Sequence, residues 1–101
     1  MTGTPARCAF TDIDGRLHVS GEVDAHSAPA LAEQLAARIG DDDVDVDFSA
    51  VEFMDSSGLR VVIDAHQQAL AAGSRLIVHA PSTSVRKIVE ISGLADHLFL
   101  D

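Results

Sequence analysis

The segment from Val44 to Gly73 constrains the fold of this chain most. Within it, the spacing of the apolar residues changes from every second residue, as in a strand, to about every 3.6 residues, as in a helix. Val44, Val46 and Phe48 alternate with two aspartates, which is the pattern of a β-strand. A second apolar set then recurs at helical spacing and stops near Gly73: Leu59, Val62, Ile63, His66 and Leu70. A strand that feeds a helix is half of a strand-helix-strand unit, and such units favour parallel pairing with right-handed crossovers.

Two further strands and a helix are predicted before this segment. Cys8–Ile13 and Leu17–Gly21 are typical of a hairpin, since a glycine follows Asp14 at its tip and accepts left-handed backbone geometry. The first helix is predicted to start after Ser27 as N-cap and to stop at Gly40, with an apolar stripe of Ala28, Leu31, Ala32, Leu35 and Ile39.

Strand and helix patterns also alternate after Gly73. Leu76–His79 is predicted as a strand, Ser82 as the cap of a helix that ends at Gly93, and His97–Leu100 as a closing strand. The order ββαβαβαβ predicts an α/β fold, with a mixed sheet of four or five strands packed with three or more helices. With 101 residues, 47% of them hydrophobic, we expect one domain over residues 1–101 with its core at about 8–100.

The middle strand carries an unusual polar pattern. A parallel strand buried on both faces is nearly all apolar, whereas Asp45 and Asp47 alternate with the valines here. We therefore expect one face of that strand to be wet, sparsely covered or hydrogen-bonded by polar groups.

Charge narrows the choice of partners. Sixteen Asp and Glu against seven Lys and Arg give a net charge of −9, which disfavours nucleic acid and favours a basic or mixed protein partner. Seven of these acids lie between Asp41 and Asp55. Cys8 is the only cysteine, and we find no signal peptide and no apolar run that could span a bilayer. We expect a cytoplasmic protein that does not bind membranes.

The stretch from Phe48 to Leu59 is predicted to hold a strand end, a short turn and a helix start with two hydroxyls at its mouth. A helix N-terminus has unpaired N–H groups and a partial positive charge. Ser56 or Ser57 could therefore cap the helix or, once phosphorylated, place a phosphate at an anion site.

Two motifs in the right order resemble a STAS domain of the anti-sigma factor antagonist type. They are Gly21-Glu22-Val23-Asp24-Ala25-His26-Ser27-Ala28-Pro29 and Phe53-Met54-Asp55-Ser56-Ser57-Gly58-Leu59, and a weaker third match is Ile91-Ser92-Gly93-Leu94. The resemblance covers about Cys8 to Leu100.

The resemblance implies a protein-binding switch. Members of this family, when unphosphorylated, bind an anti-sigma factor that is also a serine kinase, and so release the sigma factor. The kinase phosphorylates the serine after the motif aspartate, here Ser56, and a phosphatase restores the binding form. Asp24 is implied to lie near Ser56 on the partner-binding surface, together with Asp55, Ser57 and Gly58. We expect a monomer.

Each of these residues also has a simpler interpretation. Ser57 competes with Ser56 as the phosphate acceptor, because chemistry alone does not separate adjacent hydroxyls. Asp55 and Asp24 could be turn residues that bond their own backbone. Gly58 is either a tolerated first-turn glycine or the space that a partner needs for close approach.

Catalytic and metal sites have little support. Neither serine has the flanking glycines of a hydrolase nucleophile elbow, and the chain lacks a Gly-Lys-Ser/Thr phosphate loop. No pair among His18, His26, His66, His79 and His97 has the i, i+4 spacing of a zinc helix. Asp41, Asp43, Asp45 and Glu52 imitate a calcium loop, but its required glycine is replaced by Val46. We expect no enzyme activity, no cofactor and no metal.

A rival hypothesis is a STAS-like module whose Ser56 is never phosphorylated and which serves as a permanent scaffold or a small-ligand sensor. The two hypotheses differ in what replacing Ser56 by Asp does to partner binding.

Overall fold

The computed structural model describes residues 8–93 and 99–100, and it confirms the predicted order ββαβαβαβ. The elements are β1 (Cys8–Ile13), β2 (Arg16–Val23), α1 (Ala28–Ala36), β3 (Val44–Met54), α2 (Ser56–Ala71), β4 (Leu76–His79), α3 (Thr83–Ser92) and β5 (Phe99–Leu100). The sheet order is β1-β2-β3-β4-β5, with β1 antiparallel to β2 and the other neighbours parallel. The mixed sheet with three helices is therefore as predicted.

The hairpin turns where the sequence indicates. Asp14 and Gly15 both have left-handed backbone angles, with φ of 53° and 81°, and Gly15 N donates to Asp12 Oδ1 at 3.1 Å. Two successive positive φ values are typical of the tight turns that match the twist of a hairpin. The turn thus fixes the pairing of Ile13 with Arg16.

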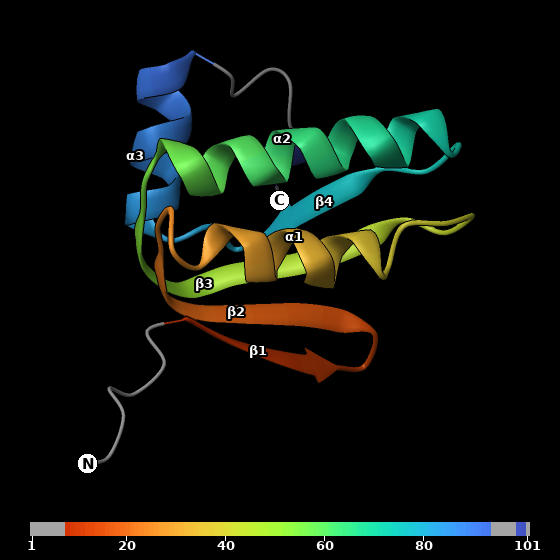
Figure 1. The fold of residues 1–101 in the computed structure, drawn as a ribbon, viewed down its shortest axis with the longest axis horizontal. Helices are drawn as coiled ribbons and strands as arrows, with labels where there is room; N and C mark the ends of the chain where they lie inside the picture. The colour runs from red at the N-terminus through yellow and green to blue at the C-terminus, as the bar shows by residue number, and fades with distance from the viewer. Residues whose placement is uncertain (1–7, 94–98, 101) are drawn as a thin grey trace.

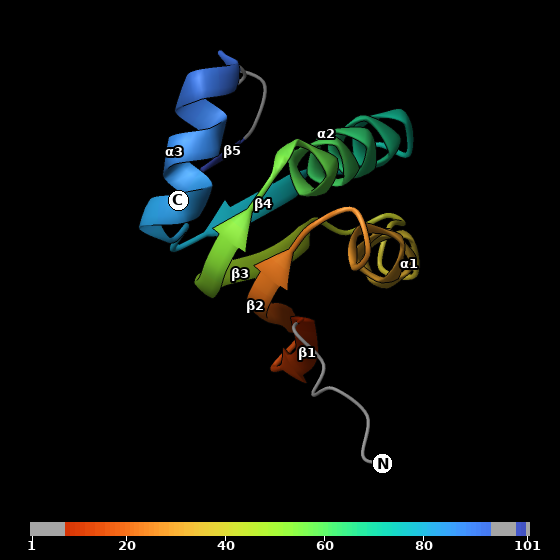
Figure 2. The same ribbon diagram turned by 60° about the vertical axis from the view of Figure 1, so that its left-hand side comes forward.

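Helices α1 and α2 lie side by side on one face of the sheet, as Figures 1 and 2 show. Helix α3 crosses the end of the sheet toward which β2, β3 and β4 run, and α1 and α2 begin at that same end (Figure 1). The largest fully buried side chains come from the strands and from all three helices: Phe48, Leu17, Leu31, Leu35, Leu76, Val19, Val23, Val46, Val51, Val62, Val78 and Val89. This core anchors the loops at the carboxyl end of the sheet.

The polar face expected of β3 is present. Val44, Val46 and Phe48 are buried, while Asp47 Oδ1 accepts hydrogen bonds from Ser49 N at 2.8 Å and from Ser49 Oγ at 2.6 Å. Asp45 Oδ1 lies 2.7 Å from Nε2 of His79 on the neighbouring strand. Polar partners therefore compensate the two aspartates, as the alternation predicted.

Strand β3 is longer than predicted. The stretch Ser49–Met54, which we interpreted as a strand end and turn, belongs to the strand. Its pairing with β2 shifts register between His18 and Ser20 and again between Gly21 and Glu22, and β3 has one extra residue at each place. Such bulges break the alternation of buried and exposed residues, which is the signal that sequence patterning depends on.

Helix α1 also differs from its prediction at both ends. Ser27 makes no side-chain cap hydrogen bond, and the helix ends at Ala36 rather than at Gly40. Ser27 Oγ instead donates to Glu22 O at 3.0 Å, because the preceding loop uses the hydroxyl. In α2, Leu70 was placed in the apolar stripe but is 52% exposed.

The remaining elements agree with their predictions. Ser82 Oγ caps α3 by accepting from Val85 N at 3.3 Å, and Gly93 ends that helix with a φ of 75°. The closing strand is described over Phe99–Leu100, and the rest of its predicted range, including His97, lies outside the described residues, as does Leu94. None of the described helices is long and apolar enough to cross a membrane.

Candidate functional site

The two sequence motifs meet at the carboxyl ends of neighbouring strands. Val23, the last residue of β2, pairs in register with Met54, the last residue of β3. Asp24 and Asp55 each follow directly, and Asp55 N donates to Val23 O at 3.1 Å. Adjacent strands lie about 4.8 Å apart, so the parallel register places the two loops next to each other. The resemblance to the STAS family implied that Asp24 would lie near Ser56.

Asp55, rather than a serine, caps helix α2. Its backbone is extended, and its Oδ1 accepts from Ser57 N at 2.8 Å and from Gly58 N at 3.3 Å. Its carbonyl oxygen accepts from Leu59 N at 3.1 Å. The interpretation of Ser56 or Ser57 as the cap is therefore wrong, because the carboxylate one residue earlier has the required geometry.

This cap changes the electrostatics of the predicted anion site. The carboxylate of Asp55 already occupies the N–H groups of Ser57 and Gly58 and supplies the negative charge that the helix N-terminus favours. The N-terminus of α2 is therefore already bound by a carboxylate of the chain itself, that of Asp55.

The two candidate acceptor hydroxyls differ in exposure. Ser56 is the first residue of α2 and is exposed, whereas Ser57 is half-buried. Ser56 is therefore the more accessible of the two residues, which agrees with the register of the motif.

Asp24 organises the loop between β2 and α1. Its Oδ1 accepts from His26 N at 3.0 Å, from Ser27 N at 3.1 Å and from Ser27 Oγ at 3.2 Å. The hydrogen bond from the Ser27 backbone is the main reason that the pKa of Asp24 lies below its ordinary value. The carboxylate is therefore held in a fixed, ionised form within the loop between β2 and α1.

Gly58 allows α2 to approach the sheet. A Cβ atom at this position would lie 2.7 Å from Val23 Cγ1 and 2.9 Å from Met54 Cγ. The space that its missing side chain leaves is used by the chain's own residues, so the glycine sets how closely the first turn packs on β2 and β3.

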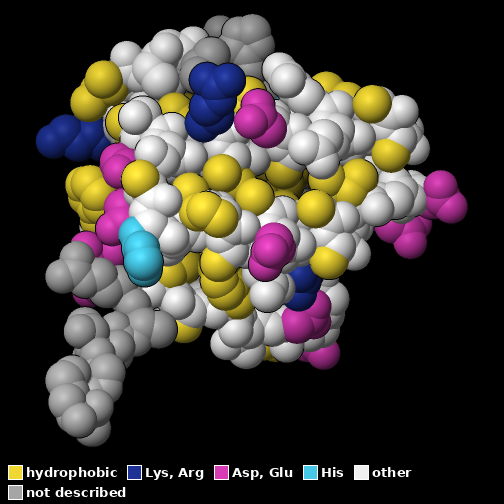
Figure 3. All heavy atoms as spheres, in the orientation of Figure 1, with side chains coloured by type: hydrophobic (Ala, Val, Ile, Leu, Met, Phe, Trp, Pro, Cys, Tyr) yellow, Lys and Arg dark blue, Asp and Glu magenta, His cyan; other side chains and the backbone are white. Residues whose placement is uncertain are grey.

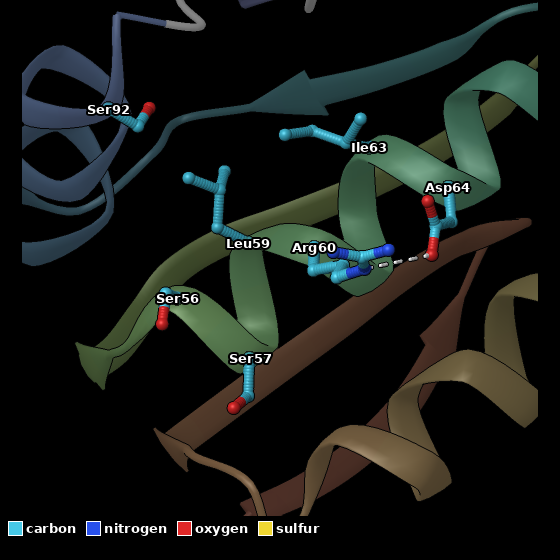
Figure 4. A pocket seen from close by; sticks show the side chains of 7 residues that line it. All are labelled: Ser56, Ser57, Leu59, Arg60, Ile63, Asp64 and Ser92. Atoms are coloured by element: carbon cyan, nitrogen blue, oxygen red, sulfur yellow. Dashed lines mark ion pairs between the residues drawn. The ribbon is translucent and has the colours of Figure 1, made fainter.

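An open groove of about 470 Å³ adjoins Ser56 (Figure 4). Most of its lining comes from α2, with Leu59 and Ile63 as apolar residues, and Ser92 contributes from α3. Arg60 and Asp64 form an ion pair with Nε and Oδ2 3.9 Å apart. The surface over α1 and α2 mixes apolar side chains with charges of both signs, as Figure 3 shows.

Sequence reasoning missed this groove and its charged pair. The signal was present in part, because Ser56, Arg60 and Asp64 follow one another at the i, i+4 spacing of one helix face. The contribution of Ser92 was not predictable from spacing, since it depends on how α3 crosses the sheet.

No group of three or more His, Cys, Asp or Glu side chains suited to a metal ion exists among residues 8–93 and 99–100. His66 is buried and accepts a hydrogen bond from Leu76 N at its Nδ1, 3.2 Å away. Its geometry is that of a structural histidine.

Comparisons with known proteins agree with this fold. The family model described as "Mlab, STAS domain" matches residues 6–101. An anti-sigma-B factor antagonist of Listeria monocytogenes is 32% identical over 82 residues, which cover 79% of this chain and 72% of that protein. The anti-sigma-B factor antagonist of Bacillus subtilis is also 32% identical, over 82% of this chain and 77% of its own length.

A solved structure leads to the same conclusion. The crystal structure of an anti-sigma factor antagonist from Mycobacterium paratuberculosis has a TM-score of 0.75 and 30% sequence identity. The match covers 92% of this chain and 82% of that one. The chain therefore belongs to the STAS domain family, among the anti-sigma factor antagonists.

Proposed function

We propose that this protein is a phosphorylation-controlled antagonist that binds an anti-sigma factor with serine kinase activity and thereby releases a sigma factor. The kinase phosphorylates Ser56, which ends the binding, and a serine phosphatase restores it. The protein acts as a monomeric, cytoplasmic, single-domain regulator and is a substrate rather than an enzyme.

The observation that carries this proposal is the position of Ser56. Its hydroxyl lies exposed at the first residue of α2, directly after the capping carboxylate of Asp55 and at one end of the groove. Asp24 is held in the adjacent loop by the Ser27 hydrogen bonds. The partner-binding surface then consists of Asp24, Asp55, Ser56, Ser57 and Gly58, of which Gly58 is buried and contributes by setting how closely the first turn of α2 packs on the sheet.

Charge explains how the modification would act. A phosphate adds about −1.5 to −2 charges at pH 7. Beside Asp55 and Asp24 this charge must be desolvated whenever a partner covers Ser56, and both carboxylates oppose it. Binding is lost at the interface, while the fold stays unchanged because Asp55 still caps α2.

The kinase and the site are tested together by affinity capture. Wild-type, Ser56→Ala and Ser56→Asp baits are incubated with lysate of the source organism, and bound proteins are identified by mass spectrometry. We expect a serine kinase to be captured by the wild type and by Ser56→Ala but not by Ser56→Asp. Ser57→Asp serves as the matched control for the neighbouring hydroxyl.

Other results of the affinity capture would support a different function or a different phosphate acceptor. If all baits capture the same proteins, Ser56 has no switching role, and the permanent scaffold or small-ligand sensor replaces the proposed antagonist. If Ser57→Asp abolishes capture and Ser56→Asp does not, the acceptor is Ser57.

A further inference from the structure

We propose that Arg60 is the internal receptor for the phosphate on Ser56, and that phosphorylation moves the Arg60 guanidinium from Asp64 to the phosphoserine. This inference rests on the proposed phosphorylation of Ser56 and assigns the residue that holds the modified side chain.

The carboxylate of Asp55 already occupies backbone donors at the N-terminus of α2. The N–H groups of Ser57 and Gly58 donate to Asp55 Oδ1, and Leu59 N donates to Asp55 O. A phosphate on Ser56 would have to compete with the capping carboxylate for these donors. It therefore needs a cation outside the first turn.

Arg60 lies where it can reach a phosphate on Ser56, and its side chain is free to change rotamer. It lies four residues after Ser56, on the same helix face, and both residues line the groove (Figure 4). Among the described residues that line this groove, Arg60 is the one with a positive charge. Its side chain is 83% exposed, so it can change rotamer without disturbing the core.

The present partner of Arg60 is a weak competitor. The Nε of Arg60 lies 3.9 Å from Asp64 Oδ2, and the Asp64 side chain is 54% exposed. In this pair the base precedes the acid, which is the less favourable order for i, i+4 ion pairs. A phosphoserine at position 56 reverses the order, with the acid at i and the base at i+4.

Helix geometry and charge favour the exchange. Helical side chains lean toward the N-terminus, so Arg60 extends naturally over the turn that carries Ser56. The phosphate also offers up to two negative charges and three acceptor oxygens that suit a guanidinium fork, whereas Asp64 offers one charge. The modified chain thus holds its phosphate against the groove face of α2.

The test is a phosphorus NMR titration of the full chain with phosphoserine incorporated directly at position 56 during translation. No kinase or partner is needed, so this test is independent of the proposed function. The second phosphate pKa, about 6 in an unperturbed phosphoserine, is compared in the wild type and in Arg60→Gln. We expect the substitution to raise that pKa by about 0.3 units, the size of an i, i+4 ion pair.

Two matched variants complete the design. Lys87→Gln removes one positive charge from α3 at a residue that does not line the groove, and should leave the phosphate pKa within about 0.1 units of wild type. Asp64→Asn removes the competing carboxylate, and Arg60→Gln should then have a larger effect than in the wild-type background.

The inference is overturned if Arg60→Gln leaves the phosphate pKa unchanged, or if Lys87→Gln shifts it equally. A phosphorylated chain that still binds its kinase would instead refute the proposed switch and would leave the Arg60 pair standing.

Discussion

A methyl group added at Gly58 would overlap Val23 Cγ1 and would also lie 3.1 Å from the carbonyl oxygen of Val23. We predict that Gly58→Ala lowers the free energy of unfolding by about 1–3 kcal/mol, since α2 must move away from the end of β2. The better helix propensity of alanine offsets this by at most about 1 kcal/mol. Urea denaturation measures the change.

Gly40 provides the matched control for that prediction. A Cβ atom there has no neighbour within 4 Å, and its φ lies outside the left-handed region. Gly40→Ala should leave stability unchanged within about 0.5 kcal/mol. Equal stability of the two variants would contradict the close packing that we assign to Gly58.

Asp55 combines a structural role with a proposed binding role, and two substitutions separate them. Asp55→Ala removes the acceptor for Ser57 N and Gly58 N and should cost about 1–2 kcal/mol of stability. Asp55→Asn keeps an oxygen at the capping position and should stay close to wild type in thermal unfolding. If Asp55→Asn is as unstable as Asp55→Ala, the charge rather than the hydrogen bonds stabilises the helix start.

At the scale of elements, His66 links α2 to the start of β4. Its Nδ1 accepts from Leu76 N, and burial lowers its pKa below the ordinary value of 6.5. The unfolded chain therefore binds a proton at a pH at which the folded chain keeps the ring neutral. We predict that the free energy of unfolding falls as the pH drops below about 6.5 toward the folded pKa of His66.

This prediction is tested by urea denaturation between pH 7.5 and 5 (roughly the range in which histidine titrates) with His66→Asn and His66→Leu. Asn can keep an acceptor for Leu76 N without titrating, so the pH dependence in this window should shrink. Leu leaves that N–H without its acceptor and should cost about 1–3 kcal/mol at neutral pH. An unchanged pH profile in both variants would exclude His66 as its cause.

The elements also show which parts of the fold were predictable. The order of strands and helices followed from the alternation of apolar spacings, and the Asp14-Gly15 turn and the Ser82 cap followed from local chemistry. The length of β3 could not be predicted from local patterns, because its two bulges depend on pairing with β2. The cap of α2 was assigned one or two residues too late, since a carboxylate and two hydroxyls compete for that role.

For the candidate site, the loops that carry Asp24 and Asp55 were predicted, but the groove beside Ser56 was not. The expectation that Asp24 lies near Ser56 came from the resemblance to the STAS family, and the pairing of β2 with β3 places Asp24 and Asp55 at one edge of the sheet. The groove between α2 and Ser92 arises from the crossing of α3 over the end of the sheet, which no local pattern encodes.

At the scale of the whole molecule, the net charge of −9 favours a partner with a basic surface and speeds its association. The seven acids between Asp41 and Asp55 do not form one cluster, because the five at positions 41–47 lie before or early in β3 and Ser56 follows its other end. Near the site, the carboxylate of Asp55 opposes a dianionic phosphate on Ser56 once a partner covers it. A local modification can therefore control a whole interface without a change of fold.

Calorimetric titration of the captured kinase with two forms of this protein, unmodified and carrying phosphoserine at position 56, measures what phosphorylation does to binding. We predict tight binding of the unmodified form and at least about tenfold weaker binding of the phosphorylated form, a loss of about 1.4 kcal/mol or more. Circular dichroism should show the same fold in both. Equal affinity of the two forms would contradict the account and would make Ser56 an ordinary surface residue of a permanent binding module.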